Sequence, residues 1–456
     1  MVRFPAAHFS RNGRHRKQLC FIIGLAASCS VHAIDLLEFY QRALASEPTY
    51  RAAQAEANAS REVLPQARSQ LLPNLQAAGS KSRADTERTS QDRFGRDVTE
   101  DFDYTSSTYS LTLRQPLFRL QSWAAYKQAE ANIGGYQAKL DGEEQTLGVR
   151  VAGAYFDALM AEDFLAFVQA QKEAYQGQLN AATRAFKLGE GTRTDIDEAQ
   201  ARYDLTLAQE LKAKQNTRFT KHQLEVLVNI PVSSLARLDP TRMDLSPLQP
   251  ASLDAWMEKS VDHNPQLRQL NAMLDAARLE VSKARAGHMP TVDLVMLYRK
   301  SDSDSESTIN QRNDTKQLGL QVAIPLYAGG HTQSTVRQAL ASVDRIQEQV
   351  EATRRALQLQ VRKEYQSIVE GQENIRANEI AVHSADQAVL STRKGIEAGT
   401  RTSLDVLNAL QQKATAARDL ANARYQYVMA QIRILSLTGG LNLDSVGQVN
   451  RWLIPG

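Results

Sequence analysis

Cysteine is almost absent from this chain of 456 residues: its two cysteines, Cys20 and Cys29, both lie within the first 33 residues. That segment has the three parts of a secretory signal peptide, namely a basic stretch, an apolar run and small residues at a cleavage site. These parts lie at 11–17, 19–27 and 31–33. Cleavage after Ala33 would leave a mature chain without cysteine, which excludes disulfide bonds and cysteine metal sites.

Two other interpretations of residues 1–33 stay open. The first is an N-terminal membrane anchor, but the apolar run is shorter than the roughly 20 residues that a spanning helix needs. The second is lipidation of Cys29, whose aliphatic neighbour Leu25 lies one position too early for such a site. A signal peptide over 1–33 therefore remains our prediction.

The chain also lacks an excess of charge of one sign and any long hydrophobic run. Its formal charge is +3, and the basic residues of 1–33 alone account for more than that. No basic patch of the kind that nucleic-acid binding requires is present. After residue 33 no segment resembles a transmembrane helix, so an exported chain of this type is periplasmic, secreted or an outer membrane β-barrel.

The residue patterns of enzymes and metal sites are missing as well. The histidines outside the first 33 residues are scattered, without the spacing of metal ligands; they are His222, His263, His288, His331 and His383. No phosphate-binding loop or nucleophile elbow occurs. We therefore predict a protein that is not an enzyme and has no metal or other cofactor.

Proline is absent from two long stretches, 117–230 and 326–454. Both are dense in Ala, Gln, Glu, Lys, Arg and Leu, which favour helix. A continuous helix from Pro116 to Gly189 would be roughly 100 Å long at about 1.5 Å per residue. Helices of that length need lateral packing against other helices, in a coiled coil or a helical tube.

The residues that interrupt these patterns occur twice in the same order. The first series is Pro48, Pro73, Pro116 and then Gly189-x-x-Thr192-x-x-Asp195, and the second is Pro265, Pro290, Pro325 and then Gly399-x-x-Thr402-x-x-Asp405. Because proline and glycine fix where helices and strands end, shared positions indicate a shared architecture. We predict one structural unit present twice, over 34–240 and 241–456.

Each long helical stretch ends at the Gly-x-x-Thr-x-x-Asp motif. Glycine favours the left-handed turn that closes a helix. Threonine is a good N-cap for the next helix, and an aspartate three residues later suits its positive end. Each half is therefore predicted to contain a long helical hairpin, with its tip near 189–195 in the first and near 399–405 in the second.

Between the second and third prolines of each series the period changes from helical to alternating. Leu318, Leu320 and Val322, for example, alternate with polar or small residues. An apolar face with a period of two predicts strands, here in hairpins at about 74–116 and 291–325. Strands of about nine to eleven residues would span an outer membrane. The polar segments 81–103 and 300–315 are predicted to be the long loops between the paired strands.

Four strands per chain cannot close a barrel, and an open sheet edge is not stable in lipid. The barrel must therefore be shared between copies. Two copies would give eight strands, whose interior is filled by side chains, and three copies would give twelve strands with a lumen. The long hairpins below such a barrel would form a tube.

The chain resembles the TolC-like outer membrane exit ducts, from Asp35 to about Leu443. The resemblance is carried by ASEPTYRAAQAE (45–56), LLPNL (71–75), QPLF (115–118), IPLYAGG (324–330) and AGTRTSLDVLNA (398–409). It implies an α+β membrane protein: a homotrimer with a twelve-stranded β-barrel in outer membrane lipid, continued by a long α-helical barrel in the periplasm. It also implies docking to a periplasmic adaptor protein and an inner-membrane transporter.

The segment AGTRTSLDVLNA is more similar to the ducts of type I protein secretion than to dedicated drug-efflux members. The latter carry an aromatic or aliphatic residue at the position of Thr402. The resemblance thus favours protein export with an ABC transporter. Multidrug efflux with a proton-driven pump is the alternative.

The resemblance also assigns roles at the tips. It places Asp405 in a ring of carboxylates that narrows the entrance, with Asn408 at a second position that is acidic in TolC. Thr194, Asp195 and Arg401 correspond to a gate latch, in which Ile396 replaces a tyrosine. Asp405 could equally serve only as a helix cap, and Arg401 and Asp195 could be ordinary surface residues.

The adaptor contacts are expected at the tip residues Gly189, Thr192, Gly399 and Thr402.

Two other protein classes share some of these features. A periplasmic adaptor has one helical hairpin per chain, and an elongated coiled-coil scaffold lacks alternating strands.

Overall fold

The computed structural model describes residues 34–246, 249–305 and 308–454. The signal peptide predicted over 1–33, including Cys20 and Cys29, lies outside these residues. The helices are α1 Leu36–Ser46, α2 Pro48–Arg61, α3 Val63–Ser69, α4 Leu120–Lys187, α5 Arg193–Val228, α6 Leu253–His263, α7 Pro265–Arg285, the 3₁₀ helix η1 Ala286–His288, α8 His331–Glu397, α9 Ser403–Leu437 and α10 Leu443–Asn450. The strands are β1 Asn74–Gln91, β2 Asp97–Phe118, β3 Arg237–Leu238, β4 Thr291–Ser305, β5 Thr308–Ala323 and β6 Leu453–Ile454.

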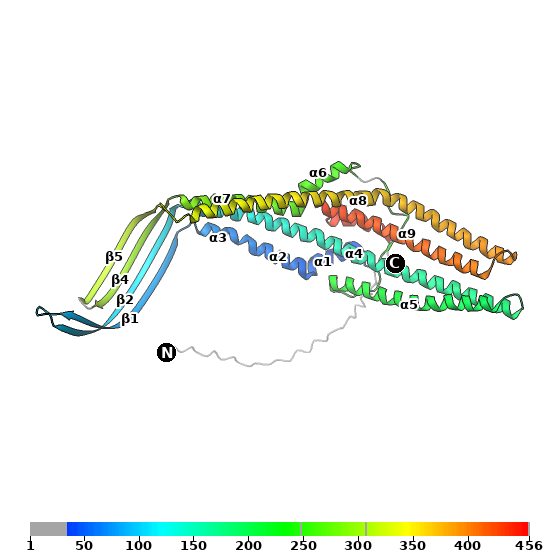
Figure 1. Ribbon diagram of the computed structural model, residues 1–456, viewed down its shortest axis with the longest axis horizontal. Helices are drawn as coiled ribbons and strands as arrows, with labels where there is room; N and C mark the ends of the chain where they lie inside the picture. The colour runs from blue at the N-terminus through cyan, green and yellow to red at the C-terminus, as the bar shows by residue number, and fades with distance from the viewer. Residues whose placement is uncertain (1–33, 247–248, 306–307, 455–456) are drawn as a thin grey trace, which may run out of the picture.

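The chain is a long rod with a sheet at one end and two helical hairpin tips at the other (Figure 1). The sheet is antiparallel with the order β1-β2-β4-β5. The helices next to the sheet keep this order, since α3 packs on α4, α4 on α7 and α7 on α8. Towards the tips the order is α5–α4–α9–α8. The long elements therefore form a single layer, with β1 and α5 on one side and β5 and α8 on the other, and the short helices α6 and α10 pack against it.

The proline-free stretches form the two longest helices, α4 with 68 residues and α8 with 67. Helices of this length are held by packing along their sides. The core around α4 lies where aromatic residues of α1, α4 and α9 meet, among them Phe39, Tyr155, Phe156 and Tyr425. The core of α8 is a separate cluster that it shares with α9. No helix in the described part of the chain has an apolar stretch long enough to cross a membrane.

The sheet has one apolar face and one largely polar face. Register aligns one row across the four strands on the apolar face, namely Leu75, Leu113, Met296 and Leu318. The next row, on the opposite face, is Gln76, Thr112, Leu297 and Gln317. Alternation of this kind is what a lipid-facing sheet requires. The prediction of four strands per chain is confirmed.

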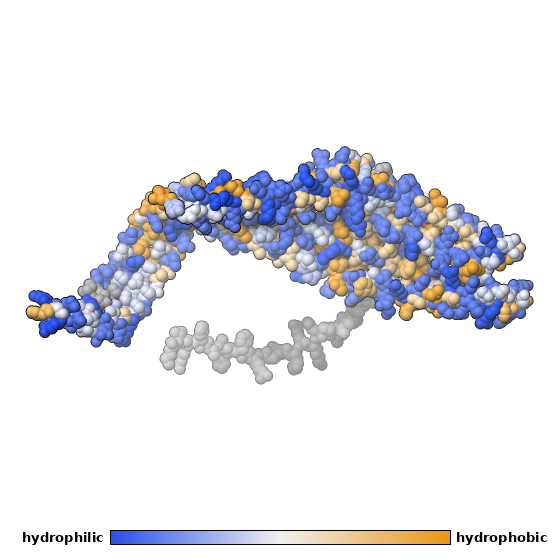
Figure 2. Space-filling view, viewed as in Figure 1, coloured by the Kyte–Doolittle hydropathy of each residue, from blue (hydrophilic) through white to orange (hydrophobic). Residues whose placement is uncertain are grey.

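The predicted loops at 81–103 and 300–315 are wrong, because the paired strands extend far into both segments. β1 and β2 pair as far as Gln91 with Asp97, and β4 and β5 as far as Ser305 with Thr308. The strands are accordingly 15 to 22 residues long rather than nine to eleven. Cross-strand polar pairs stabilise this part, including Arg83 with Asp103. A strand with both faces in water has no apolar alternation, so polar composition did not distinguish it from a loop. Figure 2 shows this hydrophilic end of the sheet.

A buried charge cluster fixes the sheet to the helical part. The Asp293 carboxylate on β4 is 2% exposed. It accepts hydrogen bonds from Arg114 of β2 at 3.0 Å and from Arg119, the N-cap position of α4, at 2.8 Å. Charge-assisted bonds of this kind are short and directional. The start of the longest helix is therefore tied to the neighbouring strand, on the polar face of the sheet.

Candidate functional site

The two hairpin tips are the candidate site, and each begins with a helix end of the same design. Gly189 follows α4 with φ +80° and Gly399 follows α8 with φ +68°, values that favour glycine. The amides of Gly189 and Glu190 bond to carbonyls of the last helical turn at 3.1 and 2.9 Å. Gly399 and Thr400 do the same at 2.9 and 2.8 Å. Both ends are Schellman motifs, which reverse the chain within a few residues.

The second helix of each hairpin starts with a capping box. The Asp195 amide donates to the Thr192 hydroxyl at 3.1 Å, and the Thr192 amide donates to the Asp195 carboxylate at 2.9 Å. At the other tip the Asp405 amide donates to Thr402 at 3.3 Å, and the Thr402 amide donates to Asp405 at 2.9 Å. The capping role predicted for these residues is confirmed.

The cap leaves half of the Asp405 carboxylate available. Both cap bonds end on Oδ2, and no group in the described part of the chain donates a hydrogen bond to Oδ1. The amide and hydroxyl of Thr402 and the positive charge of Arg401 lower the pKa of Asp405. Within one chain this carboxylate therefore stays ionised at neutral pH, with one oxygen not used by the cap.

The proposed latch residues lie on different tips. Thr194 is exposed on the first turn of α5, and the Asp195 carboxylate is held by its own cap. Arg401 lies at the second tip, with its stem against Gly395, where a Cβ would be 2.5 Å from its Cγ. Within a single chain, none of the ion pairs between described residues joins Arg401 to Asp195. The latch thus remains a prediction about neighbouring copies.

Sequence reasoning missed the contacts that join the two hairpins within one chain. The Gln178 amide on α4 donates to the Ser403 hydroxyl, at the first residue of α9, at 2.7 Å. Buried side chains from all four helices meet beside it: Tyr175, Ala199, Val389, Val406, Leu407, Ala409 and Leu410. Gln178 and Ser403 are 225 residues apart, and no local pattern in the sequence marks such a pair.

Asn408, the second predicted entrance residue, is exposed one turn beyond Asp405 on α9. Its side-chain oxygen accepts a hydrogen bond from Arg202 of α5 at 3.2 Å. The second entrance position thus holds a neutral amide that is hydrogen-bonded to the Arg202 guanidinium. Asp405 and Asn408, one turn apart on α9, therefore differ in charge.

Comparison with known proteins agrees with this geometry. The family model for outer membrane efflux proteins matches residues 39–229 and 256–440. The alkaline protease secretion protein AprF of Pseudomonas aeruginosa is 37% identical over 412 residues, which cover 90% of this chain and 85% of AprF. The outer membrane protein TolC of Escherichia coli K12 is 31% identical over 451 residues, which cover 96% of this chain and 89% of TolC.

A solved structure of CusC superposes with a TM-score of 0.78 at 17% identity, covering 89% of this chain and 92% of CusC. That likeness supports the fold. The matches to sequences extend over both halves of the chain and include both hairpin tips. The chain therefore belongs to the outer membrane efflux protein family, the TolC-like outer membrane exit ducts, and is an outer membrane export channel.

Proposed function

We propose that three copies of this chain close into a twelve-stranded barrel and a continuous helical tube. The observation that carries the proposal is the open sheet: within one chain, β1 and β5 each pair with a strand on one side only. Unpaired strand edges are unstable in lipid. Since β1 and β5 run antiparallel to each other across the layer, β1 of one copy can extend the antiparallel ladder of the next.

The helices on the two sides of the layer show the same need for a partner. Large apolar side chains are exposed on α5, where Leu211 is 67% and Leu207 is 40% exposed. On α8, Leu359 is 69% and Ile380 is 68% exposed. Because α5 lies on the β1 side and α8 on the β5 side, a single head-to-tail contact buries both helix faces and pairs both strands. Repetition of such a contact closes a ring.

We infer further that the duct exports proteins by type I secretion. In this assignment an ABC transporter supplies the substrate, and a periplasmic adaptor binds the tips at Gly189, Thr192, Gly399 and Thr402. The similarity to AprF, which is named for secretion of an alkaline protease, favours this cargo class. The family description names efflux, which supports a second candidate function, multidrug efflux with a proton-driven pump.

The entrance is assigned to the second tip. Asp405 from each copy would face the axis with its free oxygen, and Asn408 would line the next turn. Arg401 would pair with Asp195 of a neighbouring copy, with Thr194 beside it. An exposed ion pair of this kind contributes on the order of 0–1 kcal/mol, which suits a gate that a docking protein opens.

The assembly is tested by measuring the mass of the purified protein in detergent and its conductance in a planar lipid bilayer. We expect about three times the chain mass and discrete, cation-preferring channels. A monomer or a dimer, or a protein that gives no conductance, would refute the proposed assembly of three copies.

The cargo is tested in cells that lack their own outer membrane channel. The chain is expressed with the ABC transporter and adaptor of a protease secretion system, and protease activity is measured in the medium. Drug susceptibility is measured in the same host with an efflux pump and its adaptor. Restored drug resistance without secreted protease would favour the efflux alternative.

A further inference from the structure

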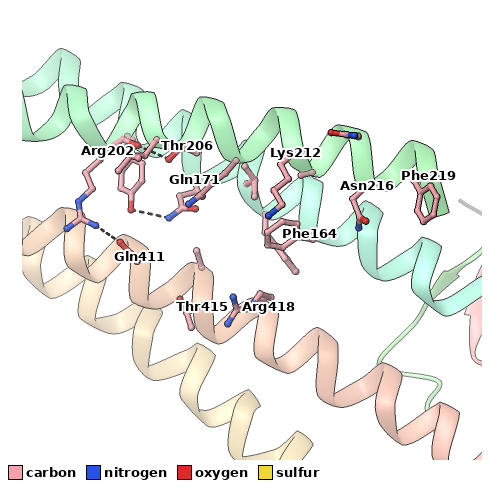
Figure 3. Close-up of a pocket in the computed structure, with 18 residues that line it drawn as sticks. Phe164, Gln171, Arg202, Thr206, Lys212, Asn216, Phe219, Gln411, Thr415 and Arg418 are labelled. Atoms are coloured by element: carbon pink, nitrogen blue, oxygen red, sulfur yellow. Dashed lines mark hydrogen bonds between the residues drawn. The ribbon is translucent and has the colours of Figure 1, made fainter. Parts of the chain in front are cut away.

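One arginine joins the two hairpins of a single chain near their tips. Arg202 lies on α5, two turns beyond the capping box of Thr192. Its guanidinium donates one hydrogen bond to the side-chain oxygen of Asn408 at 3.2 Å and another to the side-chain oxygen of Gln411. Both acceptors are on α9, which belongs to the other hairpin. Figure 3 shows Arg202 reaching across to Gln411.

We propose that Arg202 is a tie that holds the two hairpins of each chain together and resists opening of the entrance. The proposal rests on the proposed function of a gated duct and adds a residue to the gate. The tie differs from the predicted latch of Arg401 and Asp195, because it acts within one chain and does not involve the capping residues.

The position of Arg202 favours this role. Next to it, a groove of about 820 Å³ lies between α5 and α9 with α4 at its floor, lined among others by Phe167, Gln171, Lys212 and Asn216. α5 packs mainly on α4 and has only a short contact with α9. The hairpins pack on one another mainly through α4 and α9, whereas Arg202 spans the boundary between α5 and α9, where direct packing is sparse. Loss of Arg202 would therefore loosen α5 from α9.

The chemistry of the acceptors suits a tie that breaks and reforms. None of the residues that line the groove is acidic, so no carboxylate there competes with the amide oxygens for the guanidinium. Asn408 and Gln411 are exposed, and Arg202 is half-buried. A fork of two hydrogen bonds from one guanidinium fixes the distance between the helices. Neutral acceptors in water hold it less firmly than a buried ion pair would.

Single-channel recording of an Arg202→Ala variant tests the tie. We expect the open probability at a given voltage to rise by about two- to fivefold, the range of an exposed charged contact. Arg193→Ala is the matched control, since Arg193 lies on the same helix and, among the residues that the structure describes, pairs with Asp197 of its own helix alone, at 3.1 Å. An open probability in Arg202→Ala that equals that of the wild type or of the control would overturn the tie.

Substitution of the acceptor provides an independent arm. Gln411→Glu turns the second bond into an ion pair, so it should lower the open probability, and less so at high salt. The same change in an Arg202→Ala background should have no effect. An equal effect of Gln411→Glu with and without Arg202 would overturn the proposal.

A distance measurement separates failure of the tie from failure of the duct. The predicted mature chain has no cysteine, so spin labels can be attached at Glu190→Cys and Thr400→Cys, one on each tip. Labelled chains are diluted with unlabelled ones to record distances within one chain. Arg202→Ala should broaden the distance distribution towards longer values, whether or not the protein conducts. An unchanged distribution in a protein that forms channels would overturn the tie alone.

Discussion

Replacing Asp405 by asparagine is expected to separate its two roles, because Asp195 at the other tip has the same capping box and is assigned to the latch rather than to the ring of carboxylates. Asparagine keeps a side-chain oxygen for the cap and loses the charge that favours the helix N-terminus. That charge is worth about 0.3–1 kcal/mol per helix. Asp405→Asn and Asp195→Asn should therefore lower the free energy of unfolding by similar amounts, as measured by chemical denaturation.

Only Asp405→Asn should change ion selectivity. A carboxylate about 5 Å from a permeating ion contributes on the order of 0.8 kcal/mol in water, before screening by salt. Removal of one such charge reduces the preference for cations about fourfold, and a ring of three contributes more. The assay is the reversal potential in a salt gradient across a planar bilayer. An unchanged reversal potential in Asp405→Asn, or an equal change in Asp195→Asn, would refute the assignment.

The pH dependence of divalent-cation block gives a second test. The cap and Arg401 lower the pKa of Asp405 below its ordinary value of 3.8, so in an isolated tip the carboxylate would stay charged until the pH falls below that value. Three carboxylates that converge at an axis repel one another, which raises their pKa. If they converge, block should be lost at a pH above 3.8 as the solution is acidified. Loss of block only below 3.8 would show that the carboxylates do not meet.

Three further predictions concern stability. Gly439→Ala places alanine at φ +64° with its Cβ 2.7 Å from a backbone carbonyl oxygen, so it should destabilise the folded protein by at least about 1–2 kcal/mol, as measured by thermal unfolding. The control Gly177→Ala, where the added Cβ meets open space, should not destabilise the protein. Burial raises the pKa of Asp163, which accepts a hydrogen bond from Tyr425, so folding stability should decline as pH rises through that raised pKa. Asp163→Asn should abolish the decline. An equal difference in free energy of unfolding between variant and wild type at pH 4 and pH 8 would contradict this. Asp293→Ala leaves two arginines without their shared partner and should destabilise the protein by about 1–3 kcal/mol, because the arginines are partly exposed. The melting temperature of the purified protein should fall, and an unchanged melting temperature would contradict this.

Those parts of the fold that depend on local chemistry could be predicted from the sequence. Glycine and threonine fixed the ends of the hairpin helices, since both Schellman turns and both capping boxes lie at the predicted residues. The absence of proline predicted the two long helices. The outer ends of the strands could not be predicted, because a hairpin in water shows no apolar alternation and is held by pairs such as Arg88 with Glu100 across the strands.

The contacts of the candidate site likewise fall into those that a local motif predicts and those that it does not. Asp405 and Thr402 are three residues apart, so their hydrogen bonds follow from the local motif. Arg202 and Gln411 are 209 residues apart and meet only because α5 and α9 flank α4. A lone arginine on a polar helix face has the same appearance in the sequence whether it ties two hairpins or faces solvent. Pairs of this kind depend on the tertiary arrangement and become visible only in the structure.

The way the repeat packs argues for the proposed ring. Within one chain the hairpins meet where α4, the long helix of the first half of the repeat, packs on α9, the short helix of the second half. The complementary combination is α8, the long helix of the second half, with α5, the short helix of the first half. These are the two helices with exposed apolar faces at the sides of the layer. Contact between α8 and α5 of neighbouring chains would therefore repeat, between chains, the contact that already exists within each. A duplicated sequence thus supplies two similar interfaces, one inside the chain and one that needs another copy.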